Sequence, residues 1–300
     1  MALGIDKALP ELIWATQIAG SVSEQAAIET GLKKGTPVLP GCADAASEAL
    51  AAGMKSVGDT MMMYGSSTFF MTRTPKLPES KVFWGNHFLE PETFIMSGGT
   101  ATCGSLLTWF LDQFAQEIGS EAETGQNPHA MLLECYFESV PGANGVLCLP
   151  YFSGERTPIL DNYAKGTLIG LTLNHTRADV YRAVVEGIAM SIKHNIEALR
   201  TECDVSAFYA VGGGVKNRAL LQCVSDMCQV RQFVSNGSIG ASYGNCMMAA
   251  VADGQYASLD EVVGQWVTNV STVEPDDESP VYKPCLSCFF LFTGITGKPW

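Results

Sequence analysis

Short apolar runs alternate with amphipathic segments along the chain, and glycine-rich turns lie between them. The longest amphipathic pattern covers residues 177–200, where apolar side chains recur every three or four positions. Thr176 can cap the first turn of this segment, Asp179 lies near the positive end of the helix dipole, and Arg200 lies near the negative end. The pattern predicts a long helix here and an α/β fold for the chain as a whole.

The same periodicity predicts the other elements of the fold. Strands are expected at residues 59–64, 68–72, 145–152, 207–211 and 231–235, and helices at 43–52, 103–118, 217–228 and 243–252. A short run at residues 36–40 precedes the first of these helices. Prolines make residues 74–98 irregular in this interpretation, and a polar stretch covers residues 120–128. No stretch rich in Pro, Gly or Ser marks a linker between two folding units, and no internal repeat is present.

Charge and composition narrow the classes of protein to which the chain can belong. The formal net charge is −13 and the 18 Lys and Arg residues form no run, so we expect no nucleic-acid partner. No apolar stretch approaches the roughly 18–20 residues that cross a bilayer, and the first residues do not resemble a signal peptide. We therefore expect no membrane partner and a cytoplasmic location. Charged residues make up only 16% of the chain, which fits a surface that meets a partner.

Cysteine and histidine positions give little sign of metal or hydrolase chemistry. The ten cysteines are scattered, which is too sparse for a disulfide framework in a chain of this length. Cys285 and Cys288 have a metal-like spacing, but no second pair or histidine lies near them in the sequence, so no metal site is predicted. The four histidines show no triad-like arrangement with Ser or Cys.

Two turns of small residues are candidates for ligand binding. A predicted strand, three glycines and a predicted helix follow one another over residues 207–228. Such a turn presents backbone N–H groups to a phosphate or nucleotide, although triple glycines also form plain tight turns, and the pattern leaves both interpretations open. The second turn, Gly65-Ser66-Ser67, lies between two predicted strands, and its small residues let a ligand approach the backbone.

Several motifs occur in an order that resembles one protein family. Residues 166–171 (GTLIGL) and 179–186 (DVYRAVVE), with seven residues between them, match the signature of the FGGY carbohydrate kinases. The other motifs are GCAD at 41–44, YGSS at 64–67, GG at 98–99, GERTP at 154–158, and GGG at 212–214 followed by Asn217. The resemblance covers roughly residues 8–280. It implies the actin-like, ribonuclease H-like ATPase fold of the family's second domain, a mixed sheet with flanking helices.

Asp44 resembles the catalytic base of this family. In that role its carboxylate accepts a proton from the sugar hydroxyl as the hydroxyl attacks the γ-phosphate of ATP. Alanine-rich helical sequence follows Asp44, so the side chain could also serve as a helix N-cap. The two roles are compatible.

Other residues resemble the nucleotide-binding segments of the family. The resemblance assigns the nucleotide phosphates to Gly65, Ser66, Ser67 and Gly104, and the adenosine to Gly213, Gly214 and Asn217. A small residue at Gly104 also has a structural explanation at a helix start, and Asn217 could instead cap the helix that follows it. Glu155 and Arg156 are interpreted as a structural ion pair or a domain-interface element, because the family's chemistry does not require them.

The resemblance also implies that half of the kinase is missing. Full-length members begin with a domain that carries another phosphate turn and most of the sugar contacts, and nothing before residue 36 resembles it. We therefore expect a piece of a longer kinase that uses ATP or ADP with Mg²⁺, nearly inactive without its N-terminal kinase domain. Residues 1–35 are assigned to a remnant of the interdomain segment, 36–283 to the nucleotide-binding domain and 284–300 to an atypical tail.

The sugar substrate is the least determined part of this hypothesis. The GERTP and YGSS motifs resemble the xylulose and related ketose kinases more than the glycerol kinases, which favours a ketopentose such as xylulose. A homodimer is left open. The alternative is a non-catalytic nucleotide-binding or assembly module derived from such a kinase.

Overall fold

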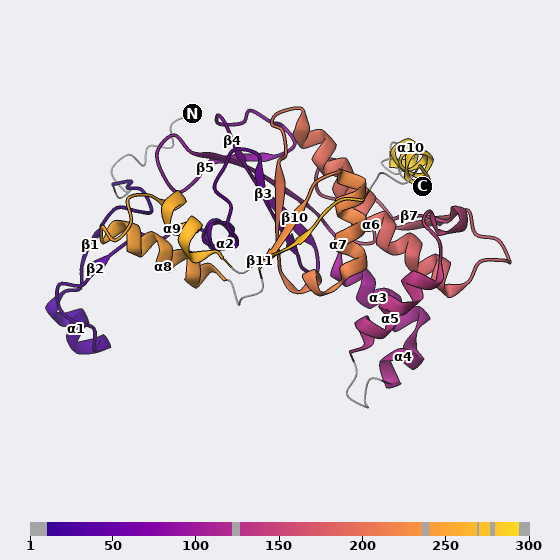
Figure 1. Cartoon of the computed structure of the whole chain (residues 1–300), viewed down its shortest axis with the longest axis horizontal. Helices are drawn as coiled ribbons and strands as arrows, with labels where there is room; N and C mark the ends of the chain where they lie inside the picture. The colour runs from indigo at the N-terminus through magenta and orange to yellow at the C-terminus, as the bar shows by residue number, and fades with distance from the viewer. Residues whose placement is uncertain (1–10, 122–126, 236–239, 269, 277–279, 294–300) are drawn as a thin grey trace. The chain divides into compact units, whose positions relative to one another are not determined.

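The chain folds into two compact units, each assembled from separate stretches of the sequence (Figure 1). The computed structural model describes residues 11–121, 127–235, 240–268, 270–276 and 280–293. Unit 1 consists of the described parts of Met1–Lys55, His87–Thr93 and Ile239–Thr268, and unit 2 of those of Ser56–Asn86, Phe94–Ser238 and Asn269–Trp300. The chain passes repeatedly between the units, so no single linker in the sequence could mark this division.

Unit 2 is built on a seven-stranded sheet with the order β11-β10-β9-β3-β4-β6-β5. The strands are β3 Asp59–Tyr64, β4 Thr68–Thr74, β5 Trp84–His87, β6 Phe94–Thr100, β9 Ala207–Val211, β10 Gln232–Ser235 and β11 Val270–Val273. Strand β3 pairs antiparallel with β4 and parallel with β9, so the sheet is mixed, as expected. The apolar residues Met61 and Met62 of β3 are fully buried in it.

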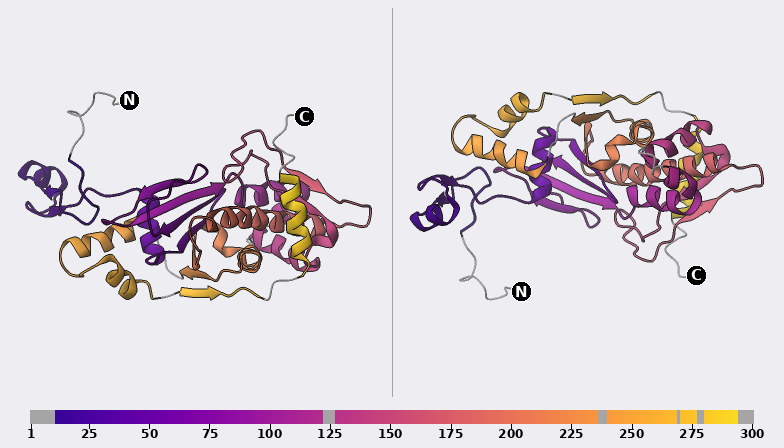
Figure 2. Two further views of the ribbon diagram at one scale, coloured as in Figure 1. Left: turned by 90° about the horizontal axis from the view of Figure 1, so that it is seen from above. Right: turned by 90° about the horizontal axis from the view of Figure 1, so that it is seen from below.

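Helices and a small hairpin complete unit 2. They are α3 Gly104–Phe114, α4 Gln116–Glu121, α5 Pro128–Glu138, α6 Arg177–Arg200, α7 Arg218–Cys228 and α10 Tyr282–Thr293, with the hairpin β7 Leu147–Leu149 and β8 Thr167–Ile169. Helix α6 runs alongside the sheet (Figure 2) and packs against α5, α7 and β7. Its predicted limits are confirmed, and Thr176 with Asp179 forms a capping box at its start.

Several expectations for unit 2 are wrong. Residues 74–98 contain β5 and most of β6, because the three prolines lie in the connections and not within the strands. The single helix expected at 103–118 is divided at Ala115, whose backbone is not helical, into α3 and α4. Helix α5 begins at Pro128, the last residue of the polar stretch, and covers residues 129–138, for which no element was predicted. The residues assigned to the tail include most of α10, whose Leu286 and Phe289 are buried. Part of the tail, residues 294–300, lies outside the described residues.

Unit 1 is formed mainly by three helices, α2 Asp44–Ala52, α8 Ala241–Ala252 and α9 Leu259–Trp266. The strands β1 Gly20–Ser21 and β2 Pro37–Val38 pair with each other, and the short helix α1 Glu24–Thr30 lies in the segment of sequence that connects them. Helices α2 and α8 pack so closely that a Cβ at Gly244 would overlap the carbonyl oxygen of Ser47. Small residues on both helices permit this approach.

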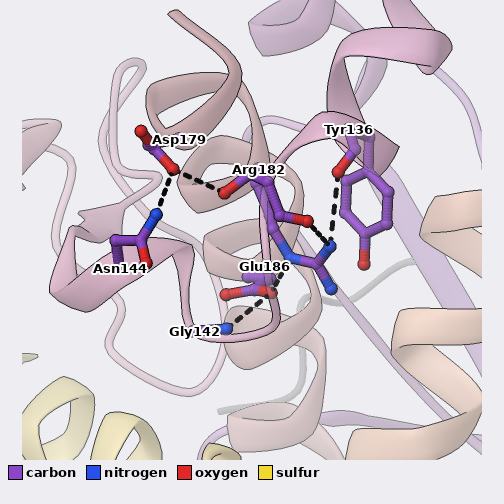
Figure 3. A network of polar contacts seen from close by, with 7 residues as sticks. Tyr136, Gly142, Asn144, Asp179, Arg182 and Glu186 are labelled. Carbon is purple, nitrogen blue, oxygen red and sulfur yellow. Dashed lines mark hydrogen bonds and ion pairs between the residues drawn. The ribbon is translucent and has the colours of Figure 1, made fainter. Parts of the chain in front are cut away.

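The signature segment of α6 carries a buried polar network (Figure 3). The Asp179 carboxylate accepts hydrogen bonds from Ser139 Oγ and Asn144 Nδ2, both at 2.7 Å. Burial raises the pKa of Asp179, but the hydrogen bonds from Ser139, Thr176 and Asn144 outweigh it and hold the pKa below its usual range. The carboxylate therefore fastens the segment after α5 to the start of α6.

One turn further along α6, Arg182 and Glu186 form a buried ion pair at 2.8 Å. Arg182 Nη1 also donates to the carbonyl oxygens of Tyr136 and Ser139 at 3.3 and 2.8 Å, and the Gly142 N–H donates to Glu186 at 3.1 Å. Burial raises the pKa of Glu186, and Arg182 partly offsets this. The signature therefore serves packing in this structure, since it joins α6 to the end of α5.

Replacing Arg182 with leucine is expected to lower the free energy of unfolding of unit 2 by about 3–5 kcal/mol, because Glu186 would stay buried without its partner. The matched control is Lys193→Leu, which breaks another i,i+4 pair on α6, with Glu197, at a more exposed position. That control should cost about 0.3–0.5 kcal/mol. Urea denaturation measures both, and equal losses would contradict the structural role of the network.

Candidate functional site

Unit 2 contains a cavity of about 880 Å³, within the range of pockets that hold small ligands. Its lining residues come from β3, α3, α5 and the turn before α7, and they are Tyr64, Gly65, Ser66, Gly104, Ser105, Leu107, Thr108, Trp109, Asp112, Asn127, His129, Ala130, Leu133, Gly213, Gly214, Lys216 and Asn217. The structure thus brings together, in one cavity, six of the eight site residues that were predicted from the sequence. The exceptions are Ser67, which does not line the cavity, and Asp44, which belongs to unit 1.

The turn between β3 and β4 is fastened to the start of α3 by backbone hydrogen bonds. The N–H groups of Cys103 and Ser105 donate to the Ser66 carbonyl at 2.8 and 3.0 Å, and the Gly104 N–H donates to the Gly65 carbonyl at 2.9 Å. A Cβ at Gly104 would lie only 2.8 Å from the Gly65 oxygen. The structural explanation for a small residue at Gly104 is therefore confirmed, and the same residue also lines the cavity.

Two of the three glycines after β9 pack against Tyr64, the last residue of β3. Gly212 has a φ of 90°, and a Cβ there would lie 2.7 Å from the Tyr64 carbonyl oxygen. A Cβ at Gly214 would lie 2.7 Å from the Cβ of Tyr64, whereas one at Gly213 would meet no atom within 4 Å. The Tyr64 hydroxyl donates to the buried Gln232 side chain at 2.6 Å. The two turns therefore meet through Tyr64.

Backbone donors remain available in both turns. Among the described residues, none accepts a hydrogen bond from the N–H groups of Ser66, Ser67, Gly213 and Gly214. Such N–H groups in turns suit an anionic ligand. Asn217 is the N-cap of α7, since its Oδ1 accepts from the Leu220 N–H at 3.0 Å, so the capping role is confirmed.

The sequence did not indicate the walls of the cavity that α3 and α5 supply. The Trp109 ring lies 5.4 Å from Phe114 and 4.7 Å from Phe152, measured between ring centroids. From α5 come His129 and Leu133, and Asn127 caps this helix by accepting the His129 N–H at 3.0 Å. The Asn-Pro start of α5 was a usable signal, but the surrounding polar residues concealed it.

Asp44 is the exposed first residue of α2 in unit 1. Ala43 occupies the N-cap position, so the capping interpretation of Asp44 is wrong by one residue. The Asp44 carboxylate accepts a hydrogen bond from the Ala45 N–H at 2.8 Å. Burial, with the charge of Asp44 as a second cause, raises the pKa of Glu48 one turn later. The catalytic role of Asp44 stays a prediction.

The Glu155 carboxylate accepts hydrogen bonds and does not form an ion pair with Arg156, which was one of the two interpretations of these residues. Its carboxylate accepts from the N–H groups of Ala101 and Arg156 at 2.8 and 2.7 Å and from Ser191 Oγ at 3.1 Å. None of the ion pairs among the described residues joins Arg156 to Glu155. Burial raises the pKa of Glu155 to about 7, and these donors limit the rise.

Within the residues that the structure describes, no group of three His, Cys, Asp or Glu side chains is arranged to hold a metal ion. The same residues include no helix with the length and apolar character needed to span a bilayer.

The sheet, the flanking helices and the glycine-lined cavity define an actin-like ATPase domain, and comparison with known proteins identifies the family. Residues 60–252 match the C-terminal domain of the FGGY family of carbohydrate kinases. A xylulose kinase of Bacillus subtilis (strain 168) is 33% identical over 271 residues, which are 89% of this chain and 52% of that relative. A gluconokinase of the same strain is 26% identical over 288 residues, 94% of this chain and 56% of the relative.

A solved structure agrees with this assignment. The crystal structure of xylulose kinase from Rhodospirillum rubrum matches with a TM-score of 0.84 and 30% identity, covering 96% of this chain and 57% of that one. The chain belongs to the FGGY family of carbohydrate kinases, as its motifs predicted. It spans about half the length of the curated relatives it matches.

Glu155→Gln is expected to change the pH dependence of stability. The pKa of Glu155 rises from 4.5 to about 7 on folding, so the folded state binds more protons in this window. The contribution of Glu155 to stability is therefore complete below about pH 4.5 and is lost as the pH rises through about 7. Urea denaturation between pH 4 and 8, at about one-unit steps, should show wild type losing stability relative to the glutamine variant. A difference that does not vary with pH would contradict the raised pKa.

Proposed function

We propose that this chain is the nucleotide-binding half of an ATP-dependent sugar kinase. The observation that carries the proposal is the meeting, in one cavity, of Gly65, Ser66, Gly104 and the glycines before α7. The phosphates of ATP or ADP would lie against the turn that contains Ser66, where backbone N–H donors have no acceptor in the described residues. The adenosine would lie against Gly213, Gly214 and Asn217.

The cavity also fits the remaining requirements of a nucleotide. Apolar surface from Leu107, Trp109 and Leu133 suits a flat base, and Lys216 supplies a positive charge. Bound ATP with Mg²⁺ supplies the transferable γ-phosphoryl group and the metal charge that stabilises its transfer. Protein-bound Mg²⁺ commonly keeps several waters and uses one or two carboxylates with the substrate phosphates, so a preformed cluster of three protein ligands is not required.

The reaction proposed for the complete enzyme is phosphorylation of a sugar hydroxyl, with Asp44 as the base. A carboxylate suits this role because it can accept the hydroxyl proton as the oxygen attacks phosphorus. The names of the relatives support a ketopentose such as xylulose, while the gluconokinase shows that the sugar varies among similar proteins. Since the relatives are about twice as long, we infer that an N-terminal kinase domain completes the active site.

Gly213→Val should weaken binding of Mg²⁺·ADP by at least about tenfold, or 1.4 kcal/mol. A side chain at Gly213 meets no atom within 4 Å, so the variant should fold while its branched side chain occupies space in the cavity. The matched control is Gly264→Val on α9 of unit 1, where a Cβ also meets no atom within 4 Å. Isothermal titration calorimetry measures the affinities. Failure of the folded wild type to bind, or equal affinity in Gly213→Val, would count against the nucleotide assignment.

Asp44→Asn should reduce sugar phosphorylation by about 10²- to 10⁴-fold, the usual contribution of a general base. The measurement requires both halves of a kinase, for example this chain fused to the N-terminal half of the Bacillus subtilis xylulose kinase, with the unsubstituted fusion as reference. Affinity for ADP should stay unchanged in the variant. A turnover equal to that of the reference fusion would show that Asp44 is not the base.

A further inference from the structure

The loop of residues 153–158 has no part in the proposed chemistry, yet two of its side chains are buried within unit 2. Glu155 is 2% exposed and Thr157 is fully buried. Both side chains reach the same segment, which leads from the end of β6 to the start of α3. The segment ends at Gly104, which lines the candidate nucleotide site.

Glu155 connects that segment to α6. One carboxylate oxygen, Oε1, accepts the N–H groups of Ala101 at 2.8 Å and of Arg156 at 2.7 Å. The other oxygen, Oε2, accepts the hydroxyl of Ser191 on α6 at 3.1 Å. The buried Glu155 side chain therefore links the Ala101 backbone to α6, the longest helix of the unit.

Thr157 makes a second connection to α6, at Gly99, which lies two residues before Ala101. Its Oγ1 accepts the Gly99 N–H at 2.9 Å and donates to Asn195 Oδ1 on α6 at 2.6 Å. A Cβ at Gly98 would lie 2.7 Å from this hydroxyl, so the glycine is required for the approach. The loop and α6 thus hold the end of β6 at two points.

The segment that Glu155 and Thr157 contact leads to the residues that bind the turn Gly65-Ser66-Ser67, which is the proposed site of the nucleotide phosphates. Ala101 lies three residues before Gly104, and the N–H groups of Cys103, Gly104 and Ser105 all donate to the carbonyl oxygens of Gly65 and Ser66. A shift of the backbone at Ala101 would move these donors. The turn that carries the available Ser66 N–H would then lose its fixed orientation.

We propose that Glu155 is a positioning residue for the nucleotide-phosphate turn, acting through Ala101 and the start of α3. This inference rests on the proposed function, because the ligand whose site is positioned is a nucleoside diphosphate or triphosphate. Glutamine can replace Glu155 in this role, since its amide oxygen can accept both N–H groups while its NH₂ donates to the Ser191 oxygen. Leucine cannot, and it leaves buried donors without an acceptor.

Calorimetric titration with Mg²⁺·ADP compares wild type, Glu155→Gln, Glu155→Leu and a control, Thr60→Val. The control removes another buried hydrogen bond of the sheet, between Thr60 and Thr72 at 2.9 Å. This pair lies at the opposite end of the β3–β4 hairpin from the turn. We expect Glu155→Leu to bind at least about tenfold more weakly and the other two variants to stay within about twofold of wild type. Equal affinities for Glu155→Leu and Thr60→Val would overturn the inference.

Amide hydrogen exchange tests the positioning without any ligand. The N–H groups of Gly104 and Ser105 should exchange faster in Glu155→Leu than in Thr60→Val when the two variants are compared at matched global stability. If wild type does not bind ADP, the nucleotide function fails, and exchange at these two amides still decides the positioning role. Should Glu155→Leu not fold, Ser191→Ala removes only one donor to Glu155 and should accelerate the same amides, and unchanged exchange there would overturn the inference.

Discussion

The close approach of backbone to backbone around Gly65 is the constraint on which the candidate site depends. Gly104 comes so near to the Gly65 carbonyl that no Cβ fits between them, and Gly212 and Gly214 approach Tyr64 in the same way. The two turns and the start of α3 come from distant parts of the chain, and they can meet only because side chains are absent at these points. Residues of all three line one cavity.

Helix α6 is the frame that holds the segments around this cavity. Its first half binds the end of α5 through Asp179, Arg182 and Glu186, and α5 forms one wall of the cavity. Its second half holds the segment before α3 through Ser191 and Asn195. The charged side chains of the family signature, Asp179, Arg182 and Glu186, therefore have a structural role: they bind other groups of the protein, and none of them lines the cavity.

Prediction from the sequence succeeded where local pattern and local structure agree. Helix α6 has a long apolar stripe with a capping residue at its start, and strands β3 and β4 flank a turn of small residues, so these elements were found with nearly the observed limits. It failed where local signals were weak or misleading. Strands β5 and β6 were not predicted because prolines occur near them, although these prolines lie outside both strands. The start of α5 was not predicted because polar residues precede it.

The sequence by itself determined the family, the positions of elements such as β3 and α6, and six residues of the cavity, because glycine turns and apolar periodicity are local properties of the chain. Only the tertiary structure decided the rest. The division into two interleaved units, the walls formed by Trp109 and His129, and the environment of Glu155 all depend on contacts between segments far apart in sequence. Glu155 illustrates the reason: its neighbour Arg156 suggested an ion pair, but burial beside Ala101 and Ser191 provided uncharged donors instead.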